Sequence, residues 1–330
     1  MYKYLKLIRY QNLLITAFTL FTIRQLVIAP LLERYGVLVY SEQWHLWLLI
    51  ISTVLLSAGG YVLNDYFDVK IDTLNNPDKV LVGRIISRNL CMSLYQILTA
   101  TGLIVGFILS WLVKSRTLSI VFIIVTGLLW FYSASYKRQF IIGNLVVAFM
   151  TSLSILLVYI VESAYLSNHY PNIVILGSNK IEIFSWVAGF AIFSFILTLI
   201  REIIKDLEDE YGDREMECRT IPIVLGRKNS LVIIFSLIIV TISLLLYVNF
   251  YLIDFQGLLS LKYTIFGIII PLLILIFLLI RAKKSSDYHN TSTFVKFIML
   301  IGILYTFIFN FLLSQQTGIQ FLNYFNIHQI

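Results

Sequence analysis

The 330-residue chain has few charged residues, because Asp, Glu, Lys and Arg together make up only 13% of it. Soluble domains carry about a quarter charged residues, so a soluble protein is excluded. Several apolar runs instead reach the roughly 20 residues that cross a bilayer core. The runs are continuous and do not alternate with polar residues, which argues against a transmembrane β-barrel. The sequence therefore predicts a polytopic, all-α membrane protein, since spanning backbone groups must be hydrogen bonded within their own segment.

Cysteine and proline are also scarce. The two cysteines, Cys91 and Cys218, are far apart and match no metal or redox spacing. Only five prolines occur, whereas a secondary transporter places its site near mid-membrane in helices broken by Gly or Pro. The N-terminal segment MYKYLKLIRYQN is basic, but the apolar stretch after it is long and is followed by a poor cleavage site. We therefore expect the first span to remain as an anchor rather than to be a cleaved signal peptide.

Nine apolar segments are predicted to span the membrane. They are residues 12–31, 44–63, 90–113, 118–136, 141–161, 183–204, 230–252, 262–281 and 293–315. Basic residues gather in the N-terminal segment and in every second loop, so these parts are expected to face the cytoplasm. The N-terminus is then inside and the C-terminus outside the cytoplasmic membrane. The net charge of +7 reflects this topology and is not a nucleic-acid signal. No linker breaks the pattern, so residues 1–330 are predicted to form a single domain.

Acidic residues repeat in one pattern at the ends of two predicted spans. Both triplets have the spacing i, i+3, i+7, and each begins one of the two long cytoplasmic loops, 64–89 and 205–229. The members are Asp65, Asp68 and Asp72 in the first loop, with Asn64 beside them, and Asp206, Asp209 and Asp213 in the second. On a helix these positions lie on one face. The sequence therefore predicts two carboxylate ladders at helix ends, arising from an internal duplication.

Six aspartates brought together would repel one another unless cations neutralise them. Carboxylates and amide carbonyls are hard oxygen ligands, and Mg²⁺ is usually held by a few carboxylates together with substrate phosphates. We therefore expect all seven residues to be metal ligands around one diphosphate, with Asp65, Asp68, Asp206 and Asp209 as the catalytic residues. Basic residues beside the ladders are expected to bind phosphate oxygens. These are Lys70, Lys79, Arg84, Lys137, Arg201 and Lys205. The alternative, two solvated helix caps, does not account for the shared spacing.

Two further charged residues fall in or at the ends of predicted spans. Arg24 lies within the first span, where a charge is costly unless it faces a cavity or a partner. It is expected either to reach an acceptor phosphate or to extend to the outer surface. Glu162 follows the fifth span on the outer side and is interpreted as a solvated cap.

Two motifs resemble those of the UbiA superfamily of intramembrane prenyltransferases. NDYFDVKIDTLNNPDK at residues 64–79 is similar to its first motif, NDxxDxxxD, and KDLEDEYGD at residues 205–213 is similar to the form KDxxDxxGD of the second. Weaker similarities are IRYQN, which ends at Asn12, and a segment that matches at Tyr132, Ser133, Lys137, Gly143 and Asn144. The chain departs from the family after the first motif, where PDKVLVGR replaces the usual PDRPLPSG, so the shape of that loop is open.

The resemblance implies an all-α bundle of about nine transmembrane helices around a central cavity, with a cytoplasmic cap over the acidic loops. It implies Mg²⁺-dependent transfer of a polyprenyl group from its diphosphate to a lipophilic acceptor, in a membrane lipid environment. It also places Lys70, Lys137 and Lys205 near the diphosphate and makes Asn12 and Tyr132 weaker substrate contacts. An apolar interior would exclude water from the allylic cation that forms when the diphosphate leaves.

The acceptor is the open part of this interpretation. The second motif is most similar to the digeranylgeranylglyceryl phosphate synthase branch, which implies a geranylgeranyl donor and geranylgeranylglyceryl phosphate as acceptor. An aromatic quinone precursor is the alternative acceptor, and a cation-coupled secondary transporter is the alternative of another class. A CDP-alcohol phosphotransferase is disfavoured, because its DGxxAR string is absent.

Overall fold

The computed structural model describes residues 2–37, 43–75, 77, 80–169 and 177–322. These residues are helical apart from connecting turns and one isolated bridge between Val82 and Ile86. The elements are α1 (Tyr2–Leu7), α2 (Tyr10–Thr22), η1 (Ile23–Ile28), α3 (Ala29–Arg34), α4 (Trp44–Asn75), α5 (Arg88–Leu112), α6 (Arg116–Ala134), η3 (Tyr136–Arg138), α7 (Ile142–His169), α8 (Gly177–Glu208), α9 (Glu210–Glu215), α10 (Ile221–Tyr247), η4 (Val248–Leu252), α11 (Leu259–Tyr263), η5 (Thr264–Ile269), α12 (Ile270–Arg281) and α13 (Ser285–Thr317).

Nine helical segments among the described residues are long and apolar enough to cross a membrane. They are Tyr10–Arg34, Trp44–Asn75, Arg88–Leu112, Arg116–Ala134, Ile142–Asn168, Asn179–Glu208, Ile221–Leu252, Leu259–Arg281 and Ser285–Thr317. The first consists of α2, η1 and α3 in succession, the seventh joins α10 to η4, and the eighth joins α11, η5 and α12. The predicted all-α bundle of about nine membrane helices is confirmed.

Two helices continue well beyond their predicted ends. The second span was expected to end at residue 63, but α4 continues to Asn75, and the sixth was expected to end at 204, but α8 continues to Glu208. Hydropathy marks only where the lipid-facing part of a helix ends. The polar turns that follow stay helical because their side chains find partners on other segments. The first acidic motif therefore lies on one helix, as predicted from its spacing, although the predicted span ended at residue 63.

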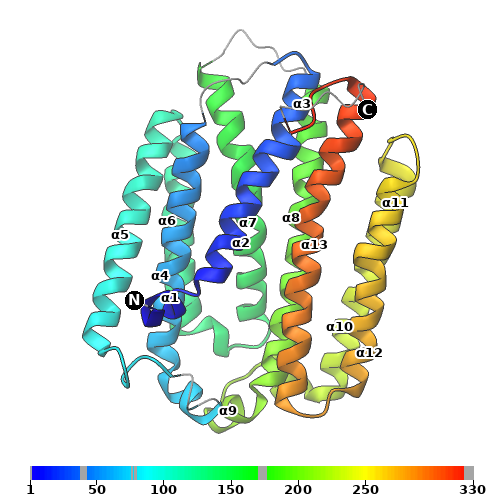
Figure 1. The fold of residues 1–330 in the computed structure, drawn as a ribbon. Coiled ribbons are helices and arrows are strands. Elements are labelled where there is room, and N and C mark those ends of the chain that lie inside the picture. The colour runs from blue at the N-terminus through cyan, green and yellow to red at the C-terminus, as the bar shows by residue number, and fades with distance from the viewer. Residues whose placement is uncertain (1, 38–42, 76, 78–79, 170–176, 323–330) are drawn as a thin grey trace.

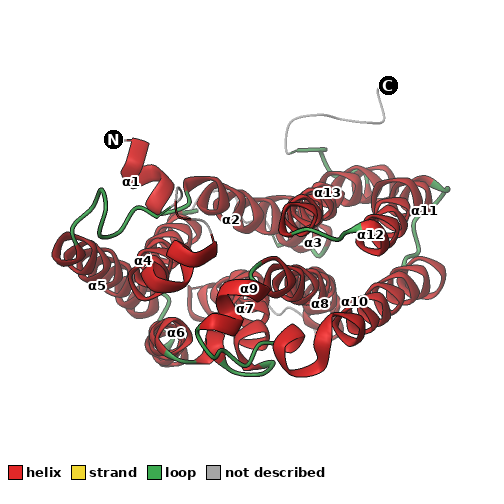
Figure 2. Ribbon diagram, turned by 90° about the horizontal axis from the view of Figure 1, so that it is seen from below, coloured by secondary structure: helices red, strands yellow, loops and turns green. Residues whose placement is uncertain are grey.

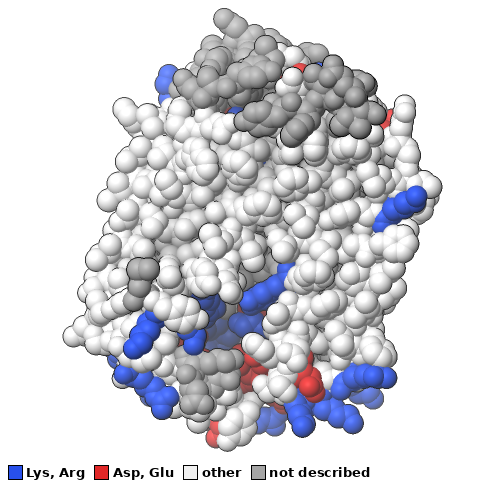
Figure 3. All heavy atoms as spheres, in the orientation of Figure 1, with Lys and Arg blue, Asp and Glu red and all other residues white. Residues whose placement is uncertain are grey.

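The helices run alongside one another from one end of the molecule to the other (Figure 1). Seen from one end they form an elongated ring, with α2 and α13 on one side and α7 and α8 on the other (Figure 2). Within the ring α8 packs against α7, α10 and α13. The short helix α9 lies at the lower end in Figure 1, whereas α13 ends at the upper end. Lys, Arg, Asp and Glu side chains gather at that lower end, below a broad uncharged belt (Figure 3).

Close packing of α4 against α5 fixes the helix that carries the first acidic motif. A Cβ atom on Gly102 would lie 3.0 Å from Leu56, and one on Gly106 would lie 3.0 Å from the Ser52 hydroxyl oxygen. The Ser52 hydroxyl donates a hydrogen bond of 2.8 Å to the carbonyl of Gly102. Small residues and buried hydroxyls of this kind let membrane helices approach closely. The direction of α4, and so the position of its polar end, follows from this contact.

A buried ion pair lies far from the acidic motifs. Arg24 is 1% exposed and Glu162 is 2% exposed. The Nε and Nη2 atoms of Arg24 donate to the two carboxylate oxygens of Glu162 over 3.3 and 3.4 Å, and its Nη1 donates to Gln25. The Nε2 atom of His45 lies 2.8 Å from the same carboxylate. The expected outward extension of Arg24 and the solvated cap at Glu162 are therefore wrong, because each charge is stabilised inside the bundle by the other.

Removal of this carboxylate should destabilise the protein strongly. We expect Glu162→Ala to lower the free energy of unfolding by about 3–5 kcal/mol, because Arg24 would be left buried and unpaired. Glu210→Ala is the control, since it removes an exposed pair with Arg214 and should cost less than about 1 kcal/mol. Denaturation in detergent, followed by circular dichroism, measures both. Equal losses in the two variants would contradict the structural role of Glu162.

Candidate active site

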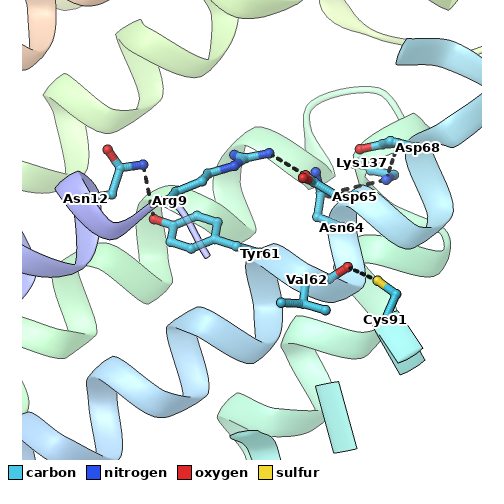
Figure 4. A network of polar contacts seen from close by, with 9 residues as sticks. All are labelled: Arg9, Asn12, Tyr61, Val62, Asn64, Asp65, Asp68, Cys91 and Lys137. Atoms are coloured by element: carbon cyan, nitrogen blue, oxygen red, sulfur yellow. Dashed lines mark hydrogen bonds and ion pairs between the residues drawn. The ribbon is translucent and has the colours of Figure 1, made fainter. Parts of the chain in front are cut away.

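The first acidic motif lies on the last turns of α4, where two cations from other segments contact it (Figure 4). The Nη2 atom of Arg9 donates to Asp65 over 2.9 Å. Lys137, in the η3 turn, donates to Asn64 over 3.2 Å and forms an ion pair with Asp68. These side chains are partly buried. Burial lowers the pKa of Lys137, an effect that Asp68 partly offsets.

The second motif does not form one continuous helical face. The helix α8 ends at Glu208 and α9 begins at Glu210, so Asp209 lies at a break, with φ −94° and ψ 5°. The ladder predicted on a single helix is therefore interrupted at its middle member. Within α8, Asp206 accepts a hydrogen bond of 2.8 Å from the amide of Asn144 on α7. Asp213 is buried on α9.

Asn75, the last residue of α4, joins the two motifs. Its side-chain nitrogen lies 3.4 Å from both the carbonyl and a carboxylate oxygen of Asp209. Its side-chain oxygen accepts a hydrogen bond of 2.8 Å from the backbone N–H of Gly212. A Cβ atom at position 212 would lie 2.5 Å from that oxygen, so only glycine fits there without displacing the amide. The glycine that precedes Asp213 in the second motif is therefore required for steric reasons.

The two motifs share one electrostatic environment. Burial raises the pKa of Asp209 to about 6, and Asp68 from the first motif adds to the rise. Burial and the neighbouring Asp209 raise the pKa of Asp213 to about 7, again with a contribution from Asp68. In the part of the chain that the structure describes, no three Asp, Glu, His or Cys side chains already form a metal cluster. The oxygens nevertheless suit a divalent cation, because opposed carboxylates with raised pKa values are stabilised by one.

A cavity of about 280 Å³ opens beside the motifs. Its charged end is lined by Arg9, Asn12, Asn64, Tyr61, Tyr132, Arg201, Glu202, Lys205 and Lys296. The Arg9 guanidinium lies 5.0 Å from the centre of the Tyr61 ring, whose hydroxyl is 3.5 Å from the amide of Asn12. The far end is lined mainly by apolar side chains, among them Ile23, Ile155 and Phe193. A polar head and a long apolar tail of one ligand would therefore fit in it together.

The structure brings most of the predicted site residues to this place, but not all of them. The seven proposed metal ligands and Lys137 lie on the segments that meet there, and Asn12, Tyr132, Arg201 and Lys205 line the cavity. Lys70 is exposed, because it lies two residues before Asp72 and so on another face of α4. Arg84 is exposed and donates to the carbonyl of Pro77. Arg24 contacts Glu162 instead of the cavity, and Lys79 lies outside the described residues.

Several residues of the site were not identified from the sequence. Arg9 entered only as part of a weak motif, and Asn75 falls in a polar loop pattern without any signal of its own. Lys296 lines the cavity from α13. It was placed near the start of the last predicted span, where a lysine normally extends to the membrane surface. Its position beside Arg201 and Lys205 was not visible without the fold. Glu202 was noted only as a neighbour that could pair with Arg201, which it does over 2.5 Å.

A helical membrane bundle with two facing acidic motifs above a deep apolar cavity defines an intramembrane prenyltransferase. The chain belongs to the UbiA prenyltransferase family, whose model matches residues 14–314. This confirms the family resemblance and excludes the transporter alternative. The chain is 31% identical over 263 residues to digeranylgeranylglyceryl phosphate synthase of Methanobrevibacter smithii, covering 78% of this chain and 84% of that one. It is 30% identical over 272 residues to the enzyme of the same name from Saccharolobus solfataricus, covering 80% and 86%.

Solved structures show the same fold. A structure of digeranylgeranylglyceryl phosphate synthase matches with a TM-score of 0.61 at 23% identity, over 95% of this chain and 98% of that one. A UbiA homologue from Archaeoglobus fulgidus, solved with GPP and Mg²⁺ bound, matches with a TM-score of 0.57 at 15% identity, over 92% and 98%. The all-helical arrangement is thus that of known prenyltransferases.

Asn75→Ala should weaken the site without unfolding it. We expect prenyl transfer to fall by about 10–100-fold, as is typical when a residue that orients metal ligands is removed, and excess Mg²⁺ should restore part of the loss. Asn229→Ala is the matched control, because Asn229 is exposed and bonds only to the Leu225 carbonyl of its own helix. Initial rates against Mg²⁺ concentration measure the effect. If Asn75→Ala and the control have the same rates, Asn75 does not join the motifs functionally.

Proposed function

We propose that the protein transfers a geranylgeranyl group from its diphosphate to geranylgeranylglyceryl phosphate, in a reaction that requires Mg²⁺. The bond between the allylic carbon and the diphosphate oxygen breaks, and the acceptor hydroxyl oxygen forms an ether bond to that carbon. The hydroxyl proton passes to the departing diphosphate. The observation that carries the proposal is the presence of two distinct anion-binding groups at the charged end of one cavity.

The first group would bind the diphosphate through Mg²⁺ ions that are held by the two acidic motifs. Asn64, Asp65, Asp68, Asp72, Asp206, Asp209 and Asp213 would hold Mg²⁺, which neutralises the negative charge that develops on the leaving diphosphate. Lys137 and Arg9 now contact Asp68 and Asp65. Both can turn to phosphate oxygens once the carboxylates bind a cation. The A. fulgidus homologue, solved with GPP and Mg²⁺, supports this assignment.

The second group is a cluster of cations within the cavity lining. Arg201, Lys205 and Lys296 lie within electrostatic range of one another. Glu202 is the single acidic residue among the described residues that line this cavity. The Nε atom of Arg201 is buried and has no hydrogen-bond partner among the described residues. A surplus of positive charge at such partly buried positions is costly unless an anion compensates it. A phosphate monoester on the acceptor does so and matches the arginine fork.

The relatives support the same acceptor. The two enzymes at about 30% identity are both named digeranylgeranylglyceryl phosphate synthase. The apolar end of the cavity would hold prenyl tails and keep water away from the allylic cation. The alternative acceptor, an aromatic quinone precursor, does not need the positively charged cluster formed by Arg201, Lys205 and Lys296.

The charged end of the bundle is proposed to face the cytoplasm. Lys and Arg side chains gather at that end (Figure 3), where α9 also lies (Figure 1). The positive-inside rule assigns such an end to the cytoplasmic side. The long helix α13 then ends on the outer side, as expected for a chain with an odd number of spans. Soluble diphosphate would be released directly into the cytoplasm.

Lys296→Met should raise the KM for the phosphate-bearing acceptor by about 10–100-fold, because one hydrogen bond to a charged group is lost. The KM for geranylgeranyl diphosphate should change little. Lys228→Met, on the exposed face of α10, is the control.

The assay uses labelled donor with geranylgeranylglyceryl phosphate or a quinone precursor in separate tubes, and Asp68→Asn and EDTA as blanks. Product only from the quinone precursor would refute the proposed acceptor, and activity in Asp68→Asn would refute the proposed metal site.

The Mg²⁺ requirement should depend on pH. Since the pKa values of Asp209 and Asp213 are raised to about 6 and about 7, these groups hold protons at pH 6 that a bound cation must displace. The Mg²⁺ concentration for half-maximal rate should therefore fall as the pH rises from about 6 to about 8. In Asp213→Asn, the Mg²⁺ concentration for half-maximal rate should change less with pH in the upper part of this pH range.

The same shifts fix the sign of the stability change. A carboxyl with a raised pKa in the folded state stabilises the fold at low pH, and this contribution is lost as the pH rises through the folded-state value. Metal-free protein should therefore melt at a lower temperature above about pH 7 than near pH 5, and Mg²⁺ should reverse the difference. Melting temperatures that do not change with pH in EDTA would contradict the raised pKa values.

A further inference from the structure

A second cavity, of about 490 Å³, lies farther from the charged end than the first. It is formed by α8, η4, η5 and α13, and its lining is largely apolar, with Trp186, Leu245, Ile268 and Phe309 among its members. Its outermost lining residues, such as Glu182 and Gln316, lie near the start of α8 and the end of α13. The mechanism above uses only the first cavity, so the second has no assigned occupant.

The two cavities meet at a thin partition. Phe190, Phe193 and Gly302 line both of them. A Cβ atom on Gly302 would lie 2.2 Å from Cε1 of Phe193, so the ring of Phe193 rests directly on the bare backbone of α13. Beside it, the rings of Phe190 and Tyr305 lie 6.3 Å apart, centre to centre. The partition is therefore one aromatic ring thick, and Phe193 closes the central cavity at its deep end.

The depth of this partition matches one prenyl length. Asp206 of the second acidic motif marks the charged end, and Phe193 lies thirteen residues earlier on α8, a distance of about 20 Å along the helix axis. A geranylgeranyl tail has a main chain of about sixteen carbons. It extends about 18 Å at the advance per bond of an extended peptide backbone. A twenty-carbon tail whose diphosphate lies at the acidic motifs, beside Asp206, thus reaches Phe193 and ends there.

We propose that Phe193, seated on Gly302, sets the length of the prenyl group that the enzyme transfers. Its ring stops a tail of twenty carbons, and the second cavity takes the distal isoprene units of a longer donor when the ring is absent. This inference rests on the proposed function in one respect, the placing of the donor diphosphate at the acidic motifs. Phe193 acts as a specificity-determining residue and takes no part in the chemistry.

The test is a competition between donors of different length. Farnesyl, geranylgeranyl and hexaprenyl diphosphates are offered together to the full-length protein with Mg²⁺ and geranylgeranylglyceryl phosphate, and products are counted by mass spectrometry. Phe193→Ala should raise the ratio of thirty-carbon to twenty-carbon product by about tenfold or more, and Phe193→Trp should lower the ratio of twenty-carbon to fifteen-carbon product similarly. Phe184→Ala is the control, because Phe184 lies on the same helix, is 45% exposed and lines neither cavity. Its ratios should equal those of the wild type.

Unchanged ratios in both Phe193 variants would overturn the inference. If Phe193→Ala does not fold, Phe193→Leu replaces it, since leucine is smaller than phenylalanine but still fills most of the site, and the same direction of change is expected.

A binding experiment separates this inference from the proposed acceptor. Non-hydrolysable thiodiphosphates of the three lengths are added with Mg²⁺ but without acceptor, and the rise in melting temperature is recorded. A thirty-carbon analogue that stabilises Phe193→Ala but not the wild type supports the inference even where no acceptor in the transfer assay gives product. Equal stabilisation of the two proteins by the thirty-carbon analogue overturns it, whatever the acceptor.

Discussion

Charge compensation inside an apolar bundle is the constraint on which this structure depends. Carboxylates and guanidinium groups cannot be buried singly at acceptable cost, and the chain pairs them across large sequence distances. Arg9 meets Asp65 and Lys137 meets Asp68, whereas Arg201 pairs with its neighbour Glu202 on the same helix. The polar end of α4 is thus linked by ion pairs to η3 and to Arg9, just before α2, as well as by packing. A substrate that carries phosphates together with a divalent cation can replace these partners without leaving any charge exposed to lipid.

Charge compensation also operates at the other end of the bundle, where it stabilises the fold and binds no substrate. Arg24, Glu162 and His45 form a network that is almost completely inaccessible and lies beyond the lining of the central cavity. Its members are at most 2% exposed. This network joins η1, α4 and α7, whereas the ion pairs beside the acidic motifs are partly exposed to the cavity. Burial, and not charge itself, distinguishes a structural ion pair from a ligand-binding one in this protein.

Much of this could be predicted from the sequence, for physical reasons that can be named. Long apolar runs require membrane helices, so nine spans followed from hydropathy alone, and two acidic triplets of equal spacing marked the site. The extension of α4 to Asn75 could not be predicted, because it depends on Asp209 and Gly212, which lie more than 130 residues away. The pairing of Arg24 with Glu162 is equally non-local, with 138 residues between them. The exposure of Lys70 could not be predicted either, because charge and proximity in sequence do not reveal the face of a helix.

The ion pairs at the first motif also bear on how the protein is made. Arg9, Asp65, Asp68 and Lys137 all belong to the part of the chain that precedes α7. During synthesis these groups can neutralise one another as soon as the fourth span and the η3 turn have emerged, before any residue of the second motif exists. The first acidic motif therefore need not wait, unpaired at the edge of the bilayer, for its partner. When α8 and α9 arrive, Asp209 and Gly212 supply the hydrogen-bonding partners of Asn75, and the last turn of α4 is completed as the later half docks.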